Sequence, residues 1–249
     1  MKTLLLLGGM TPDVTTLYYR TINTFARTHL GARHSAPLYI FSAEFESMVQ
    51  FATRGDWTSF AQAYLDPIQA LVTESSKSRV QGVVVGAILA HKVARQLEKA
   101  LKPSGVPLLH VADFLASHVK SQMPQVKTLG LIGPKVTMLG AEDPDFFIGR
   151  LESPSNNLKI LIPDSEESLN ECNRGMMEEV AKGANAVAPS TKEMFVREAK
   201  ALVARGAEAI ILGSTDLGFV IGKEDVGDIP LLDAATIHAE GVAKWACGI

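Results

Sequence analysis

The chain repeats itself at about half its length. Three short apolar segments of the first half return in the same order in the second half. The pairs are Lys2–Gly8 with Lys127–Gly133, Val83–Gly86 with Ile210–Gly213, and Val106–Leu109 with Ile229–Leu232. A repeat of this length describes two globular halves and not a solenoid of short units. We therefore expect two like half-domains, with a ligand site where they meet.

Each repeated segment is an apolar run that ends at a turn and leads into a stretch with helical spacing. After Gly8-Gly9, Thr11 is a good N-cap and Pro12 suits the first helical position. Continuous apolar strands of this kind occur in parallel sheets covered on both faces. The pattern predicts an α/β fold of two pseudo-symmetric, doubly wound domains, each with a parallel four-stranded sheet, and an interdomain cleft.

Apolar residues at three- and four-residue steps predict the helices. They are expected over residues 14–26, 60–72, 92–101, 145–151, 166–182 and 190–205, with a last helix after Asp233. Because the fourth repeated strand comes so late, we expect that last helix to pack back onto the first half. The predicted domains are therefore residues 1–115 with 231–249, and residues 116–230.

Composition excludes several classes of protein. Hydrophobic residues make up 47% and charged residues 20% of the 249 residues, as in ordinary globular chains. The net charge of −3 comes without a basic stripe, which argues against nucleic acid as a partner. The four leucines before Gly8 are too few for an export signal or a membrane span. Cys172 and Cys247 lie far apart and outside any metal-ligand spacing, so we expect a cytoplasmic protein without a metal or membrane partner.

Four loops at predicted strand ends are the candidate site, because doubly wound sheets bind ligands there. They are Gly8–Thr11, Gly86–His91, Gly133–Thr137 and Gly213–Asp216. The first loop matches neither GxGxxG nor a Walker loop, so a nucleotide is not implied. The last loop lacks the GxSxG spacing of a serine hydrolase. Its Ser, Thr and Asp also suit helix caps, and a lone histidine such as His91 also suits a structural hydrogen bond.

The motifs of the chain, in order, are Gly8-Gly9-Met10-Thr11, Tyr18-Tyr19, His34-Ser35-Ala36, Gly55-Asp56-Trp57, His91-Lys92-Val93-Ala94, His110-Val111-Ala112-Asp113, Thr137-Met138, Arg205–Gly213 and Ile237-His238-Ala239. Together they resemble the aspartate/glutamate racemase family. The resemblance implies a cofactor-independent enzyme for a small-molecule substrate, with two pseudo-symmetric α/β domains around a cleft. It also implies a homodimer.

In that family a cysteine from each half flanks the substrate α-carbon. The resemblance places the first cysteine at Gly86 and the second at Ser214, so both are absent here. Glycine cannot move a proton, and a serine hydroxyl is far less acidic than a thiol, whose pKa is about 8.5. Ala87 and Ile88 replace the Thr and Asn of the family pattern, which makes this loop more apolar.

The leading hypothesis is a diverged isomerase, lyase or cyclase of this superfamily that acts on a small carbonyl or carboxylate compound through an enol-type intermediate. Ser214 and Thr215 would orient the substrate, and Asp216 or His91 would be the general acid or base. The other predicted substrate-binding residues are Met10 and Thr11 for its anionic group, with Gly86, Ala87, Ile88 and Thr137. The alternatives are a catalytically silent ligand-binding or regulatory protein, and a residual aspartate/glutamate racemase.

Overall fold

The chain folds into two compact units in a computed structural model that describes residues 1–72 and 79–249. The first unit holds Met1–Phe114 and His238–Ile249, and the second holds Leu115–Ile237. Among the described residues, no helix combines the length and the apolar character needed to cross a bilayer.

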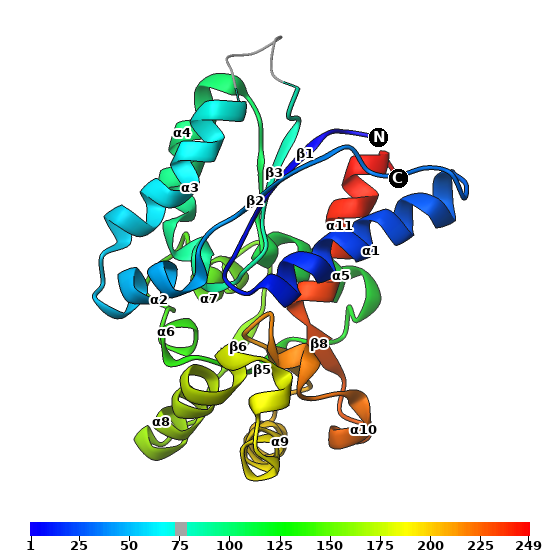
Figure 1. Cartoon of the computed structure of the whole chain (residues 1–249). Helices are drawn as coiled ribbons and strands as arrows, with labels where there is room; N and C mark the ends of the chain where they lie inside the picture. The colour runs from blue at the N-terminus through cyan, green and yellow to red at the C-terminus, as the bar shows by residue number, and fades with distance from the viewer. Residues whose placement is uncertain (73–78) are drawn as a thin grey trace. The chain divides into compact units, whose positions relative to one another are not determined.

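The first unit is built on a parallel sheet of four strands in the order β2-β1-β3-β4. The strands are β1 (Leu4–Gly8), β2 (Leu38–Ser42), β3 (Gly82–Val85) and β4 (Leu108–Leu109). The leucines of β1 are fully buried because helices cover both faces of the sheet. Figure 1 shows α1 (Pro12–Leu30) and α11 (Ala234–Cys247) on one face, with α3 (Trp57–Leu71) and α4 (Ala94–Leu101) on the other.

The second unit repeats this plan, with its parallel strands in the order β6-β5-β7-β8. The strands are β5 (Thr128–Ile132), β6 (Lys159–Leu161), β7 (Ala209–Leu212) and β8 (Leu231–Asp233). The remaining helices are α6 (Lys135–Met138), α7 (Phe147–Leu151), α8 (Glu166–Arg174), α9 (Pro189–Ala204) and α10 (Lys223–Val226). Since the two sheets share one strand order, the predicted α/β fold with two four-stranded parallel sheets is confirmed.

The sequence predicts that the chain returns to the first unit at residue 231, which is too early. β8 pairs with β7, from Ile210 with Leu231 to Leu212 with Asp233, so it completes the second sheet. The chain returns to the first unit at His238, inside α11. It leaves that unit after Phe114, inside α5 (Val111–Gln122). Neither α5 nor α2 (Phe45–Thr53) is predicted by the apolar spacing of the sequence.

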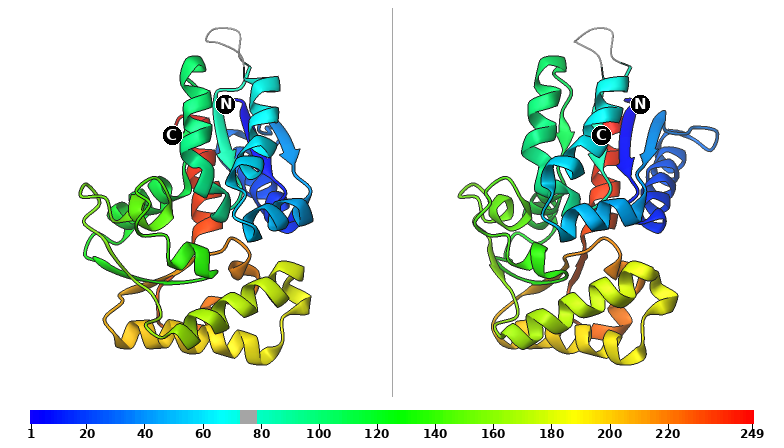
Figure 2. Two further views of the ribbon diagram at one scale, coloured as in Figure 1. Left: turned by 90° about the vertical axis from the view of Figure 1, so that its left-hand side faces the viewer. Right: turned by 60° about the vertical axis from the view of Figure 1, so that its left-hand side comes forward.

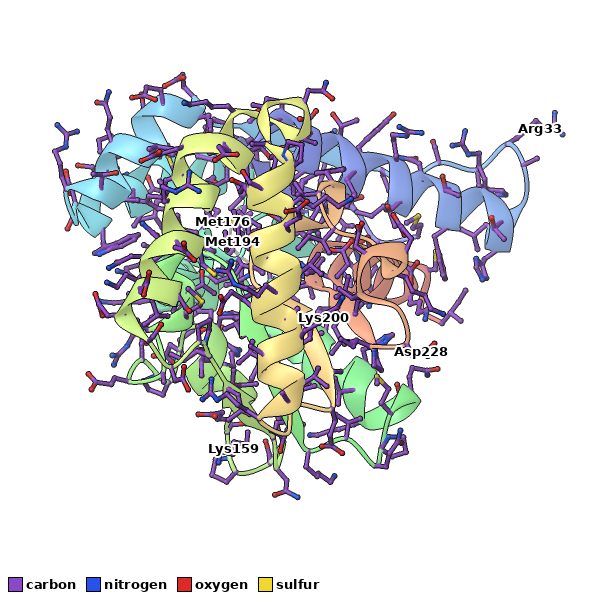
Figure 3. All side chains as sticks on the ribbon, turned by 90° about the horizontal axis from the view of Figure 1, so that it is seen from below. Arg33, Lys159, Met176, Met194, Lys200 and Asp228 are labelled. Atoms are coloured by element: carbon purple, nitrogen blue, oxygen red, sulfur yellow. The ribbon has the colours of Figure 1, made fainter. Side chains whose placement is uncertain are left out.

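The single helix predicted over residues 166–182 is interrupted. After α8 the chain forms a π-helical turn, Gly175–Glu179, and then a 3₁₀ turn, Val180–Lys182. A Cβ atom on Gly175 would lie 2.9 Å from Thr191 Cγ2 and 3.1 Å from Met194 Cε, so α9 packs directly onto this glycine. Figure 2 shows α8 and α9 as neighbours, and Figure 3 labels Met176, in the turn after α8, and Met194 on α9.

Candidate active site

The strand order fixes where each unit presents its loops. In each sheet the chain winds outward in both directions from one pair of strands, β1 and β3 in the first unit and β5 and β7 in the second. Ligands of doubly wound sheets bind beyond the carboxyl ends of such a pair. The four loops chosen from sequence follow these four strands. Gly86 N–H donates to Leu7 O at 2.9 Å, and Gly213 N–H donates to Ile132 O at 2.7 Å, so the two strand pairs end alike.

The loop after β1 is held by its own hydroxyl groups. Thr11 caps α1, its Oγ1 accepting from Val14 N–H at 3.4 Å. Thr15 Oγ1 accepts from Gly9 N–H and donates to Thr11 O, both at 3.1 Å. Met10 is buried in the apolar core of the first unit. The side chains of Met10, Thr11 and Thr15 therefore fix the shape of this loop.

The loop after β3 is tied down by His91. His91 Nδ1 lies 2.8 Å from Ala87 O, and Val111 N–H donates to His91 Nε2 at 3.3 Å. A carbonyl oxygen only accepts, so Nδ1 carries the proton of a neutral ring and Nε2 is the acceptor. Ala87, Ile88 and His91 are all buried, and Ala87 belongs to the core. These contacts favour a positioning role for His91 over the acid–base role suggested by the sequence.

A second buried histidine joins distant parts of the first unit. The Tyr18 hydroxyl lies 2.7 Å from His238 Nδ1, and His238 Nε2 lies 2.9 Å from Leu109 O. Nε2 must donate to the carbonyl, so Tyr18 donates to Nδ1. Burial, with the neighbouring His91 ring, lowers the pKa of His238 to about 3. His238 is therefore a neutral structural group, and sequence spacing could not pair it with a tyrosine 220 positions earlier.

The loop after β5 contains an unusual hydroxyl group. Thr137 is fully buried, and its Oγ1 finds no hydrogen-bond partner among the described residues. A buried hydroxyl without a partner costs about 1–3 kcal/mol, so each case needs an explanation. Lys135, two residues earlier, is already neutralised, because its Nζ pairs with Glu166 and donates to Asn170 Oδ1 at 2.9 Å. That pairing lowers the pKa of Glu166.

The loop after β7 carries three polar side chains in a row. Ser214 and Asp216 are partly exposed and Thr215 is buried. Asp216 N–H donates to Ser214 Oγ at a long 3.4 Å, and Leu217 N–H donates to Ser214 O at 3.2 Å, as the chain enters the 3₁₀ turn Leu217–Phe219. The residue that follows the equivalent glycine in the first unit is Ala87. The loop after β7 is therefore more polar directly after its glycine than the loop after β3.

The two cysteines of the chain lie in helices outside the four loops. Cys172 is buried in α8 with its Sγ 3.8 Å from Met194 Sδ, and this burial raises its thiol pKa to about 12. Cys247, the last residue of α11, is partly buried. A thiol that stays protonated at neutral pH is neither a base nor a nucleophile, so Cys172 does not supply the thiol chemistry that the family resemblance implies.

Comparison with known proteins settles the family. The model of the Asp/Glu/hydantoin racemase family matches residues 7–242. The chain belongs to this family. A candidate Asp/Glu racemase from Yersinia pestis is 31% identical, with a TM-score of 0.81 over 99% of this chain and 100% of that one. An aspartate racemase homologue from Pyrococcus horikoshii OT3 is 27% identical, with a TM-score of 0.75 over the same shares.

More distant members of the Asp/Glu/hydantoin racemase family share the fold. The aspartate racemase of Picrophilus torridus is 16% identical, with a TM-score of 0.73 over 99% of this chain and 95% of that one. The family resemblance stated from the sequence motifs is thus confirmed. In this member of the family, the residues at the positions where that resemblance places cysteines are Gly86 and Ser214.

Proposed function

We propose that this member of the racemase family is a cofactor-independent isomerase or lyase that forms an enol-type intermediate from a small carbonyl or carboxylate compound. The observation that carries the proposal is the buried hydroxyl of Thr137, which has no hydrogen-bond partner among the described residues. Thr137 follows the carboxyl end of β5, the kind of position at which doubly wound sheets bind ligands. A substrate oxygen would give this hydroxyl its missing acceptor. Donors aimed at an oxygen that becomes negatively charged are the largest single source of catalysis in many enzymes.

In the proposed reaction, the Asp216 carboxylate takes the proton from the carbon next to the carbonyl or carboxyl group. The electrons of the broken C–H bond form the enolate. Its negative oxygen accepts a hydrogen bond from Thr137, and Ser214 and Thr215 orient the substrate. Asp216 then returns its proton to a different carbon of the delocalised intermediate, so that the double bond or carbonyl group moves and the isomer is formed. In the lyase form a C–C bond breaks instead, a carboxylate leaves as carbon dioxide, and an external proton delivered by Asp216 quenches the enolate.

Asp216 is preferred to His91 as the acid or base. Its side chain is partly exposed, whereas both ring nitrogens of His91 already bind backbone groups. The enzyme proposal is preferred to a silent binding protein because a hydroxyl donor, Thr137, and a carboxylate, Asp216, lie in the segments that follow the neighbouring strands β5 and β7. Residual racemase activity on aspartate or glutamate would need a second acid–base group in place of both thiols.

The test follows α-proton exchange in D₂O by NMR over a panel of carbonyl and carboxylate compounds. We expect deuterium uptake that Asp216→Asn abolishes and that Thr137→Val lowers about 10²- to 10³-fold, the usual cost of one oxyanion donor. Thr137→Val should also raise the melting temperature, because it removes a buried hydroxyl without a partner. Thr24→Val, on the exposed face of α1, is the matched control.

The alternatives give different results in the same experiment. A compound that raises the melting temperature of the wild type and never exchanges its proton indicates a silent binding protein. Exchange with L-aspartate or L-glutamate indicates a residual racemase. Exchange that survives Asp216→Asn and Thr137→Val unchanged contradicts the assigned residues.

A further inference from the structure

Two large apolar side chains are exposed in the loops that carry the candidate chemistry. Leu139 is 51% exposed and Phe219 is 42% exposed. Among the described residues of the second unit, Met177 is the one further large apolar side chain exposed to this degree. An exposed apolar side chain beside a candidate site is a common feature of ligand sites, which are lined mainly by apolar groups.

The two loops start in contact with each other. They leave the neighbouring strands β5 and β7, and a Cβ atom on Gly133 would lie 2.9 Å from the carbonyl carbon of Gly213. From that contact, one loop leads through Thr137 to Leu139 and the other through Ser214 to Phe219. Each loop therefore passes from a hydroxyl to an exposed apolar side chain within five residues or fewer.

These loops offer a substrate no cationic side chain that is not already bound by another residue. The segment Gly213–Phe219 contains no lysine or arginine, and Lys135 of the other loop is already bound by Glu166 and Asn170. A second carboxylate of a substrate would therefore lose its hydration without gaining a cation, which is costly.

We infer that the substrate is a monocarboxylate with an apolar side chain, and not a dicarboxylate such as an acidic amino acid. Its carboxylate or carbonyl oxygen accepts a hydrogen bond from Thr137, and its apolar part contacts Leu139 and Phe219. This inference rests on the proposed function, because it assigns the substrate class of the same site.

Two pairs of compounds with matched shapes test the inference. 4-Methylpentanoate is succinate with one carboxylate replaced by an isopropyl group, and L-leucine is related to L-aspartate in the same way. Binding to the whole chain is measured by isothermal titration calorimetry. We expect the apolar member of at least one pair to bind at least about tenfold more tightly, a difference of about 1.4 kcal/mol.

Charge-introducing variants locate the apolar contact. Leu139→Arg and Phe219→Arg should each weaken 4-methylpentanoate and strengthen succinate, because arginine supplies the bidentate partner that a carboxylate needs. Ile249→Arg, at another exposed apolar residue, is the control and should leave both affinities unchanged. Thr137→Val should weaken both members of the pair by a similar factor, since both share the first carboxylate.

Failure of the apolar member to bind more tightly in either pair overturns the inference, and so does the absence of binding by all four compounds. Failure of the proposed function looks different. If 4-methylpentanoate binds as expected and no compound on the panel exchanges its proton, the substrate class stands as a ligand class and the enzyme reaction fails. If a dicarboxylate binds best and exchanges its proton, the reaction stands and the substrate class fails.

Discussion

At the scale of single residues, two glycines of the first unit differ in whether their position could hold a side chain. Gly9 has φ +92°, and a Cβ atom there would lie 2.2 Å from Ala43 N. Gly86 has ordinary space, because its nearest neighbour for a Cβ atom is Leu6 Cδ1 at 3.5 Å. Gly86, where the family resemblance places a cysteine, is therefore not required by packing.

This difference predicts two alanine variants. Gly9→Ala should lower the free energy of unfolding by at least about 2 kcal/mol, because it combines a left-handed backbone with an overlap against backbone atoms. Gly86→Ala should stay within about 1 kcal/mol of the wild type. Urea unfolding of both variants measures the difference. Equal losses would mean that the loop after β1 relaxes, or that Gly86 is packed more tightly than the structure shows.

The four loops of the candidate site could be predicted from the sequence, but the roles of their side chains could not. Residue order identified all four loops, because Gly and polar residues end each apolar run. It could not assign the roles of Met10, Ala87 and His91, because burial and the partners of each side chain depend on the packed unit. The missing partner of Thr137 was also invisible, since a sequence names a hydroxyl and not its surroundings.

At the scale of elements, local sequence patterns predicted most strands and the long helices. They failed where contacts with residues distant in sequence determine how a helix begins or ends. The start of α9 is an example. Its N-cap residue is Ala188, whose side chain cannot accept a hydrogen bond. The carboxylate of Glu179 stabilises the start of the helix in its place, accepting from Ala188 N–H at 2.8 Å and from the Thr191 hydroxyl at 2.7 Å. Those hydrogen bonds, with Arg174, lower the pKa of Glu179 to about 2. The glutamate belongs to the π-helical turn that the pattern predicted as regular helix.

The docking of α11 onto α1 and β4 predicts a pH dependence of stability. Burial gives His238 a pKa of about 3 in the folded chain, against about 6.5 for a histidine in water. Between these pH values the unfolded chain binds the proton that the folded chain does not. Stability is therefore full above about pH 6.5 and falls as the pH drops toward 3, by up to about 1.4 kcal/mol per pH unit from this group.

His238→Gln tests this expectation, since it removes the titrating ring and keeps an amide that can donate to Leu109 O. The difference in unfolding free energy between wild type and variant should shrink as the pH falls below 6.5. His34→Gln, at an exposed histidine, is the control for a general effect of losing an imidazole. A difference that is constant with pH would show that His238 takes up its proton without unfolding.

At the scale of the whole molecule, the repeat in the sequence predicted both halves and the return of the last helix. It could not locate the crossing within α11, because the apolar pattern of a helix does not change where the chain passes from one unit to the other. The residues from His238 onward complete the first unit. Lys2 N–H donates to Ala246 O at 2.8 Å, and a Cβ atom on Gly82 would lie 2.7 Å from the Trp245 ring.

Removal of residues 238–249 should therefore unfold the first unit, although its four strands all precede residue 110. The truncated chain loses the hydrogen bonds of His238 and the buried side chains of Ala239, Val242, Ala243 and Ala246. Amide hydrogen exchange resolves the two units. We expect β1 and β3 to lose protection, while β5 and β7 keep it because the second sheet retains all four strands. Deletion of Gly248 and Ile249 alone is the control. Protection retained in β1 and β3 of the truncated chain would show that the first sheet folds without α11, and that the return of the chain is not needed for its core.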